Sequence, residues 1–121
     1  MEKPHKKLDL WKVAMELVIQ VYEVTDRFPK DERFGLTDQI RRAAFSIPSN
    51  IAEGAARQTK KEFANYLHMA QGSLSELDTQ LELARQLTYL DEHAWIGLDQ
   101  HMERIDKMIS GLIRRQKSPH A

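Results

Sequence analysis

The residues that could bind a metal do not occur at the spacings that metal chemistry requires. Helix bundles hold iron with Glu-x-x-His pairs, and the one such pair here, Glu2 with His5, encloses Pro4 and is therefore not helical. The chain has no cysteine, which excludes disulfides and thiolate ligands. The histidines that fall within helical segments, none of them three residues after a carboxylate, are His68, His93 and His101. The sequence therefore predicts no metal site and no cofactor.

Catalytic groups are equally hard to assemble. Ser46, Ser49 and Ser73 are available hydroxyls, but no base and orienting group stand at a spacing that would activate them. The short stretches "AEGAAR" and "QGS" lack both the glycine-lysine spacing and the preceding strand of a phosphate-binding loop. We therefore predict no catalytic residues and a protein that is not an enzyme.

The basic residues suggest a different role. The formal net charge is zero, from 18 basic and 18 acidic side chains, which argues against a protein that coats nucleic acid by bulk charge. Local basic clusters could still contact phosphates. The candidates for nucleic-acid binding are Arg41, Arg42, Arg57, Lys60 and Lys61, together with Arg114, Arg115 and Lys117 near the C-terminus. Alternatively, the two adjacent arginines pair with acids across subunit or helix interfaces, and the basic ends only keep the chain soluble.

Four segments with a helical apolar period must position these residues, and none has the alternation of a strand. We expect helices over residues 9–26, from 37 to a stop at Gly54, from a Thr59–Glu62 capping box to about 87, and onward from a cap at Asp91. Short connections make neighbouring helices antiparallel. The prediction is an all-α, up-down four-helix bundle over residues 8–115, between flexible segments at residues 1–7 and 116–121.

The expected location is the cytoplasm. The basic N-terminus is not followed by the long apolar run of a secretory signal. No stretch approaches the roughly 20 apolar residues of a membrane span, so we expect no membrane partner.

The pattern of the second helical segment predicts three faces where a surface helix needs two. The core stripe consists of Leu36, Ile40, Ala43, Ala44, Ile47 and Ile51. A polar stripe consists of Gln39, Arg42, Ser46, Asn50 and Glu53. The third stripe mixes an aromatic and small apolar residues with an arginine, namely Arg41, Phe45, Pro48 and Ala52. Pro48 should bend the helix and release the carbonyl of Ala44 for a side chain. We expect an inter-helix polar network of Ser46, Asn50 and Glu53 with Ser73 and Glu76, unless both rows simply face water.

The stretch "FPKDERFGLTDQIRRAAFSIPSNIAEGAAR", followed by "EFANYLHMAQGSLSELDTQLELARQLTYL", resembles a four-helix-bundle family once labelled as a ribosomal protein. Its members include proteins encoded in intervening sequences of bacterial 23S rRNA genes, and a related branch contains the accessory protein of diversity-generating retroelements. The similarity covers residues 8–113, with "GAAR" where many relatives have Gly-x-Gly-Arg. The resemblance implies a homopentameric ring without catalytic activity. For the retroelement branch it also implies binding to nucleic acid and to a reverse transcriptase.

Surplus apolar surface in the sequence is consistent with such a closed homo-oligomer, since a ring buries two different patches of each subunit. The first helical segment has one apolar face with Trp11, Met15, Val18 and Tyr22 and another with Val13, Leu17 and Val24. The predicted interface residues are Phe45, Pro48, Ala52, Val13 and Leu17, whereas Trp11 and Trp95 are expected in the core. The predicted function is a non-enzymatic accessory factor that binds RNA, DNA or a nucleic-acid-handling protein; the alternative is a structural protein–protein interaction module.

Overall fold

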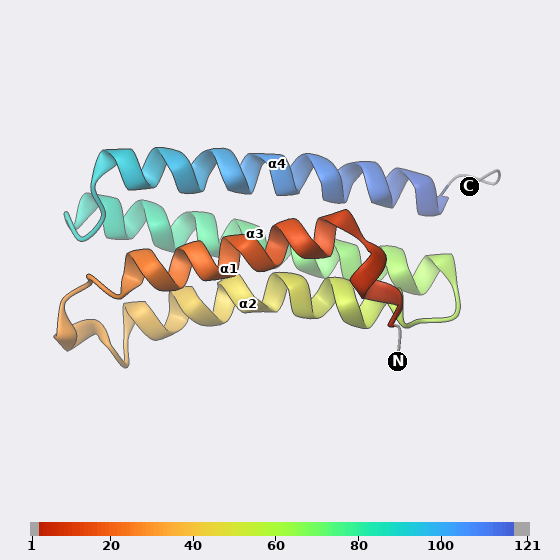
Figure 1. The fold of residues 1–121 in the computed structure, drawn as a ribbon, viewed down its shortest axis with the longest axis horizontal. Helices are drawn as coiled ribbons and strands as arrows, with labels where there is room; N and C mark the ends of the chain where they lie inside the picture. Colours follow the sequence, from red (N-terminus) through yellow and green to blue (C-terminus); the bar gives the residue numbers. More distant parts are fainter. Residues whose placement is uncertain (1–2, 118–121) are drawn as a thin grey trace.

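The computed structural model describes residues 3–117 and contains four long helices that run alternately in opposite directions (Figure 1). These are α1 (Asp9–Thr25), α2 (Leu36–Ala55), α3 (Lys60–Gln86) and α4 (Glu92–Lys117), with short 3-10 helices η1 (Pro4–Lys7) and η2 (Lys30–Glu32) before α1 and α2. Each long helix packs against the next, and α4 packs against α1. The predicted all-α four-helix fold is confirmed.

Side-chain caps begin α3 and α4 where the sequence predicts them. The Thr59 hydroxyl accepts a hydrogen bond from the backbone N–H of Glu62 at 3.1 Å and donates one to the Glu62 carboxylate at 2.9 Å. The Asp91 carboxylate accepts a hydrogen bond from the backbone N–H of Ala94 at 2.8 Å. Each cap satisfies a backbone donor that has no partner within the helix, which fixes where the helix starts.

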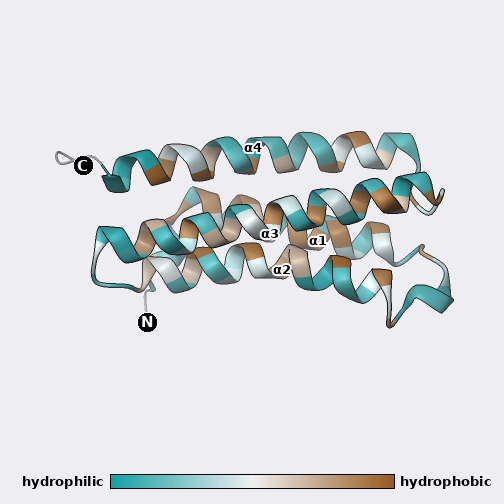
Figure 2. Cartoon of the chain, turned by 180° about the vertical axis from the view of Figure 1, so that it is seen from behind, coloured by the Kyte–Doolittle hydropathy of each residue, from teal (hydrophilic) through white to brown (hydrophobic). Residues whose placement is uncertain are grey.

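A continuous apolar core runs along the inside of the bundle. Fully buried side chains come from every long helix, including Leu17, Ile47, Leu77 and Ile105. Along the ribbons hydrophobic and hydrophilic residues alternate in short bands, as expected when each helix buries one stripe (Figure 2). Burial of one such aliphatic side chain contributes about 1.5–3 kcal/mol, so this core dominates the stability of the fold.

Polar side chains join α4 to its two neighbours at the edge of the core. The ring nitrogens of His101 lie 2.8 Å from Gln20 Oε1 and 3.2 Å from the backbone carbonyl of Val13, both on α1. On the other side, Gln71 Nε2 of α3 donates to Ser110 Oγ at 3.1 Å. His101 is half-buried, at the edge of the core.

Helix α2 continues without a break through Pro48. Proline has no N–H, so the Ala44 carbonyl loses its usual helical partner. The polar side chains nearby bond backward to other carbonyls of the same helix, which explains why they surround the proline. These bonds run from Ser46 Oγ to Ala43 O (2.8 Å), from Ser49 Oγ to Phe45 O (2.9 Å) and from Asn50 Nδ2 to Ser46 O (2.9 Å). The expected capture of the Ala44 carbonyl is thus replaced by bonds to its neighbours.

Gly54 does not stop α2, which corrects the prediction made from the sequence. The helix includes Gly54 and ends at Ala55, and among the described glycines none has a positive φ. Gly54 is instead a buried contact point, because a Cβ built there would lie 2.6 Å from Tyr66 Cβ and 2.9 Å from Phe63 Cδ1 on α3. The absent side chain therefore lets α2 and α3 approach closely.

The two ends of the bundle differ in which parts of the chain they contain. The N-terminus, the α2–α3 turn and the C-terminal end of α4 lie at one end, and the α1–α2 and α3–α4 connections lie at the other (Figure 1). Part of residues 1–7, predicted to be flexible, is helix η1, where His5 packs edge-on against Trp11 with centroids 4.9 Å apart. Residues 116–117 belong to α4, and residues 1–2 and 118–121 lie outside the described residues. Among the described helices, none is both long and apolar enough to cross a membrane.

Candidate nucleic-acid interface

Basic side chains gather at the end of the bundle that holds the N-terminus, and we call this the basic end. Three ten-residue stretches meet there, namely residues 3–12, 53–62 and 108–117 (Figure 1). They contain ten basic and three acidic side chains, a net charge of +7 in a chain whose total is zero. All ten are exposed: Lys3, Lys6, Lys7, Lys12, Arg57, Lys60, Lys61, Arg114, Arg115 and Lys117. Positive charge is therefore concentrated at one end of the bundle, although basic and acidic side chains are equal in number over the whole chain.

A groove brings the two termini of the fold together within this end. Its volume is about 610 Å³, and Lys7 from η1 lines it together with Arg114 and Arg115 from the last turns of α4. Leu8, Leu10, Met108 and Leu112 form its apolar wall, and the carboxylate of Asp9 also reaches it. Cations more than 100 residues apart in sequence thus share one surface.

The α2–α3 turn holds the second part of the basic end. Arg57 Nη2 lies 3.3 Å from a Glu53 carboxylate oxygen and donates to the Tyr66 hydroxyl at 2.6 Å, while its guanidinium stacks on the Tyr66 ring at 4.8 Å. Lys60 and Lys61 follow in the first turn of α3. Arg57 is therefore held in place by α2 and α3, with its neighbours exposed beside it.

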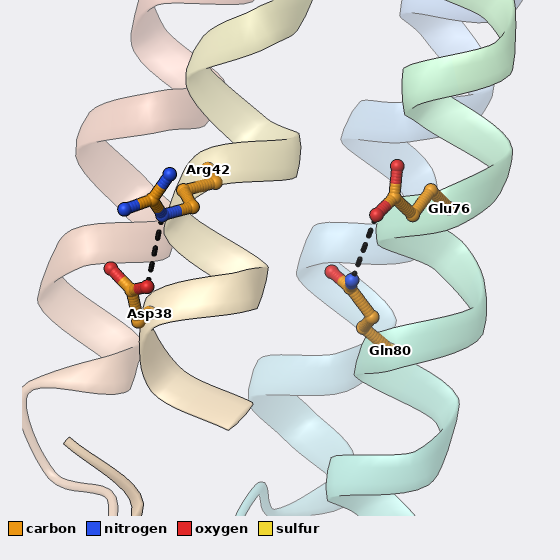
Figure 3. A network of polar contacts seen from close by, with 4 residues as sticks. All are labelled: Asp38, Arg42, Glu76 and Gln80. Carbon is orange, nitrogen blue, oxygen red and sulfur yellow. Dashed lines mark hydrogen bonds and ion pairs between the residues drawn. The ribbon is translucent and has the colours of Figure 1, made fainter. Parts of the chain in front are cut away.

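Two of the candidates proposed from sequence lie away from this end, in the first half of α2. Arg41 ties α2 to α1, because its Nε donates to Thr25 Oγ1 at 2.9 Å and its guanidinium lies 4.4 Å from the centre of the Tyr22 ring. Arg42 pairs with Asp38 one turn earlier at 2.9 Å (Figure 3). Arg42 thus pairs with an acid of its own helix rather than across an interface, whereas Arg41 bonds across the α1–α2 interface to a hydroxyl and a backbone carbonyl. The structure brings six of the eight predicted residues together.

The expected polar network between α2 and α3 does not form among the residues proposed for it. Ser46 and Asn50 bond to carbonyls of α2, and Glu53 bonds to Arg57 in the turn that follows. Glu76 accepts a hydrogen bond from Gln80 on its own helix (Figure 3), and Ser73 has no hydrogen bond to the α2 residues of the set. Local partners one turn away satisfy these groups more readily than partners on a second helix.

An apolar groove of about 280 Å³ lies between α1 and α2. Its lining is Trp11, Met15, Val18, Phe45, Pro48, Ser49 and Ala52. Phe45 is 47% exposed, and Tyr22 and Ile19 extend the exposed apolar surface of α1. Three of the five predicted interface residues, Phe45, Pro48 and Ala52, therefore line one groove.

Val13 and Leu17 correct that prediction, because both side chains are buried in the core of the subunit, at 6% and 0% exposure. The outward apolar face of α1 is the other one, with Trp11, Met15 and Val18. Trp11 and Trp95 pack partly buried against the core, and the Arg85 guanidinium lies 4.3 Å from the Trp95 ring centre. Neither tryptophan is a free stacking surface.

A third groove, between α3 and α4, is acidic. It has a volume of about 350 Å³ and is lined by Asp78, Asp99, Glu103 and Asp106 with Leu74, Ser75 and Met102. Partial burial, and then the charges of Asp99 and Glu82, raise the pKa of Asp78 above its ordinary value. No group of three or more candidate ligands in the described part of the chain is arranged to hold a metal ion.

Sequence reasoning missed two features of the basic end. The first is Tyr66, which holds Arg57, and the second is the gathering of Lys3, Lys6, Lys7 and Lys12 with the C-terminal arginines. The antiparallel order of the helices contained the signal for the second, because it places the start of the first helix beside the end of the fourth.

Comparison with known proteins places the chain in a family. The 23S rRNA-intervening sequence protein family matches residues 6–111. A similar solved structure is that of a protein with unknown function from the S23 ribosomal protein family of Bacteroides thetaiotaomicron, with a TM-score of 0.77, 22% identity, and coverage of 86% of this chain and 97% of that one. No curated protein matches the chain. At that identity the structural likeness supports the fold, and the match over residues 6–111 shows that the chain belongs to the 23S rRNA-intervening sequence protein family.

Proposed function

We propose that this protein is a non-enzymatic accessory factor that binds nucleic acid through the basic end. The observation that supports this most is the net charge of +7 over residues 3–12, 53–62 and 108–117 in a chain with no net charge. Phosphate contacts by Lys and Arg supply most of the non-specific affinity for nucleic acid. A cytoplasmic location is part of the proposal, as is a protein partner that handles nucleic acid, such as a reverse transcriptase.

The position of Lys60 and Lys61 gives independent support. Both lie in the first turn of α3, where the helix macrodipole is positive and disfavours cations. Only Glu62 in that turn is acidic. Lys61 is exposed at this site, where a cation lowers helix stability, and phosphate binding would give it a favourable role.

The test is the salt dependence of binding to a labelled oligonucleotide, measured by fluorescence anisotropy between about 50 and 200 mM salt. Wild-type affinity should fall steeply with salt. The triple variant R114A/R115A/K117A should flatten the slope of log K against log salt by up to about 2.7. The matched control R27A/K30A/R33A removes three cations from the opposite end and should leave the slope unchanged. Equal slopes for both triple variants, or no binding by the wild type, would reject the basic end as the contact.

The alternative is a structural protein–protein interaction module, and the apolar groove between α1 and α2 favours it. We propose that this groove is covered by a second copy in a closed homo-oligomer, for which the family resemblance implies five subunits. The wild-type mass in solution should then be a multiple of 14.1 kDa. Phe45→Glu should reduce it to that of a monomer, whereas Ile96→Glu, a similarly exposed position at 43%, should not. A monomeric wild type would refute self-association and leave nucleic-acid binding to be judged separately.

A further inference from the structure

We infer that the groove between η1 and the end of α4 binds an acidic peptide segment of a protein partner, and that this segment carries bulky aliphatic side chains. The inference rests on the part of the proposed function that includes a protein partner, and it adds the surface and the chemistry of that contact. Three features of the groove support it, which are its apolar wall, its two unpaired arginines and the carboxylate in its lining.

The apolar wall gives the groove a property that phosphate binding does not need. Leu8, Met108 and Leu112 line it, and each is half-buried, so part of each side chain remains accessible. The volume of about 610 Å³ lies within the range of roughly 300–1,000 Å³ that ligand sites occupy. Removal of apolar surface from water favours a ligand with aliphatic groups, which a sugar–phosphate backbone lacks. The wall therefore indicates a ligand with aliphatic side chains.

The two arginines of the groove have no partner in the described part of the chain. Arg114 and Arg115 are exposed, and neither side chain forms a hydrogen bond, an ion pair or a ring contact with residues 3–117. The Arg114 guanidinium lies near Gly111 in the groove, because a Cβ built at Gly111 would be 3.7 Å from Arg114 Nη2. A guanidinium can donate two parallel hydrogen bonds to a carboxylate. Unengaged arginines beside an apolar wall thus suit a segment in which Glu or Asp accompanies aliphatic residues.

A carboxylate in the lining favours a peptide over a nucleic acid. Asp9 is exposed at the start of α1, and its side chain has no hydrogen bond or ion pair with the other described residues. Every unit of a nucleic-acid backbone is anionic, so a strand laid in the groove would be repelled there. A peptide can place a backbone N–H against the carboxylate, because each residue other than proline carries one. With Lys7, Arg114 and Arg115 the lining is still net positive, which complements an acidic segment.

The first test compares two labelled peptides of about ten residues for binding to the full chain, by fluorescence anisotropy at about 150 mM salt. One carries leucines as i and i+4 anchors among glutamates and glycines, and the other carries serines in place of the leucines. The leucine peptide should bind at least about tenfold more tightly, because the charges are equal and only this peptide has aliphatic side chains to bury. Equal affinities, or no binding of the leucine peptide, would overturn the inference.

The second test locates the peptide on the protein. R114A/R115A should lower the affinity for the leucine peptide about tenfold, because it removes both guanidinium groups at exposed positions where the fold is not at risk. M108Q keeps the length of the side chain but removes apolar surface, and should lower the affinity about fivefold. The matched control M69Q changes a methionine of α3 that is 53% exposed and outside the groove lining, and should match the wild type. Equal effects of M108Q and M69Q, or an unchanged affinity of R114A/R115A, would overturn the inference.

The third test separates the inference from nucleic-acid binding. Lys60 and Lys61 belong to the basic end but lie on α3, outside the groove lining. K60A/K61A should weaken binding of a labelled oligonucleotide and change the peptide affinity by no more than about twofold, whereas M108Q should weaken binding of the peptide alone. A chain that binds the oligonucleotide but not the peptide would overturn the inference and leave the nucleic-acid role standing. A chain that binds the leucine peptide in the groove but no oligonucleotide would support the inference and refute the nucleic-acid role.

Discussion

Gly54 on α2 lies directly against Tyr66 on α3, because a Cβ built at Gly54 would lie 2.6 Å from the Cβ of Tyr66. The hydroxyl of the same tyrosine accepts a hydrogen bond from Arg57, three residues beyond the glycine, and its ring lies under the Arg57 guanidinium. The close approach of the two helices and the placement of a basic side chain at the end of the bundle therefore depend on one contact.

Gly54→Ala should destabilise the protein by about 1–3 kcal/mol, because the added methyl group meets Tyr66 and Phe63 in a packed core. Gly72→Ala is the matched control, since a Cβ there meets nothing within 4 Å. Alanine in an exposed helix interior should stabilise by about 0.5–1 kcal/mol. Urea denaturation followed by circular dichroism measures both, and equal effects of the two substitutions would contradict the packing role of Gly54.

Arg41→Ala should lower stability by about 1–3 kcal/mol, because it removes a side chain that bonds to Thr25 and lies over Tyr22. Arg42→Ala should change stability by no more than about 0.5 kcal/mol, since its side chain is 73% exposed and forms a surface pair with Asp38. Thermal unfolding distinguishes the two adjacent arginines. If Arg41→Ala left stability unchanged and weakened nucleic-acid binding, Arg41 would be a nucleic-acid contact rather than a residue that holds α1 and α2 together.

Lys61→Glu should stabilise the free protein by up to about 1 kcal/mol, because it replaces a cation with an anion at the N-terminus of α3. The same change should weaken binding to an oligonucleotide by removing one phosphate contact and adding repulsion. Unfolding and anisotropy measurements on one preparation test both effects. A variant that lost stability and binding together would instead indicate damage to the fold.

Asp78→Asn should raise stability at pH 7 and have little effect below the ordinary aspartate pKa of 3.8. Partial burial, Asp99 and Glu82 raise the pKa of Asp78 in the folded state. The folded protein therefore binds this proton more tightly than the unfolded chain, and its contribution to stability is lost as pH rises through the folded pKa. The urea midpoints of the wild type and the variant are compared at pH 7 and near pH 3. A lower midpoint for the variant at pH 7 would contradict the predicted gain in stability.

Local signals in the sequence were sufficient for the helices and two of their caps. Thr59 and Asp91 begin helices because a short polar side chain can satisfy a backbone donor of its own first turn, which depends on few residues. Gly54 was misjudged because glycine serves equally as a helix stop and as a point of close packing. The second use depends on Tyr66, which a local pattern cannot place.

Surfaces were harder to predict than helices. Both apolar faces of α1 have similar residues, so the sequence did not show that Leu17 packs in the core and Met15 beside the groove. Which face of α1 is buried depends on where α2 and α4 pack against it. Likewise the basic end arises from three separated stretches, and only the antiparallel order of the helices joins Lys7 to Arg114.

The most direct test of nucleic-acid binding by the basic end is hydrogen–deuterium exchange of the full chain with and without a saturating oligonucleotide. The account predicts slower amide exchange in residues 3–12, 53–62 and 108–117 and no change in the α1–α2 and α3–α4 connections at the opposite end. Protection confined to the groove between α1 and α2, to the opposite end or to no region would contradict it.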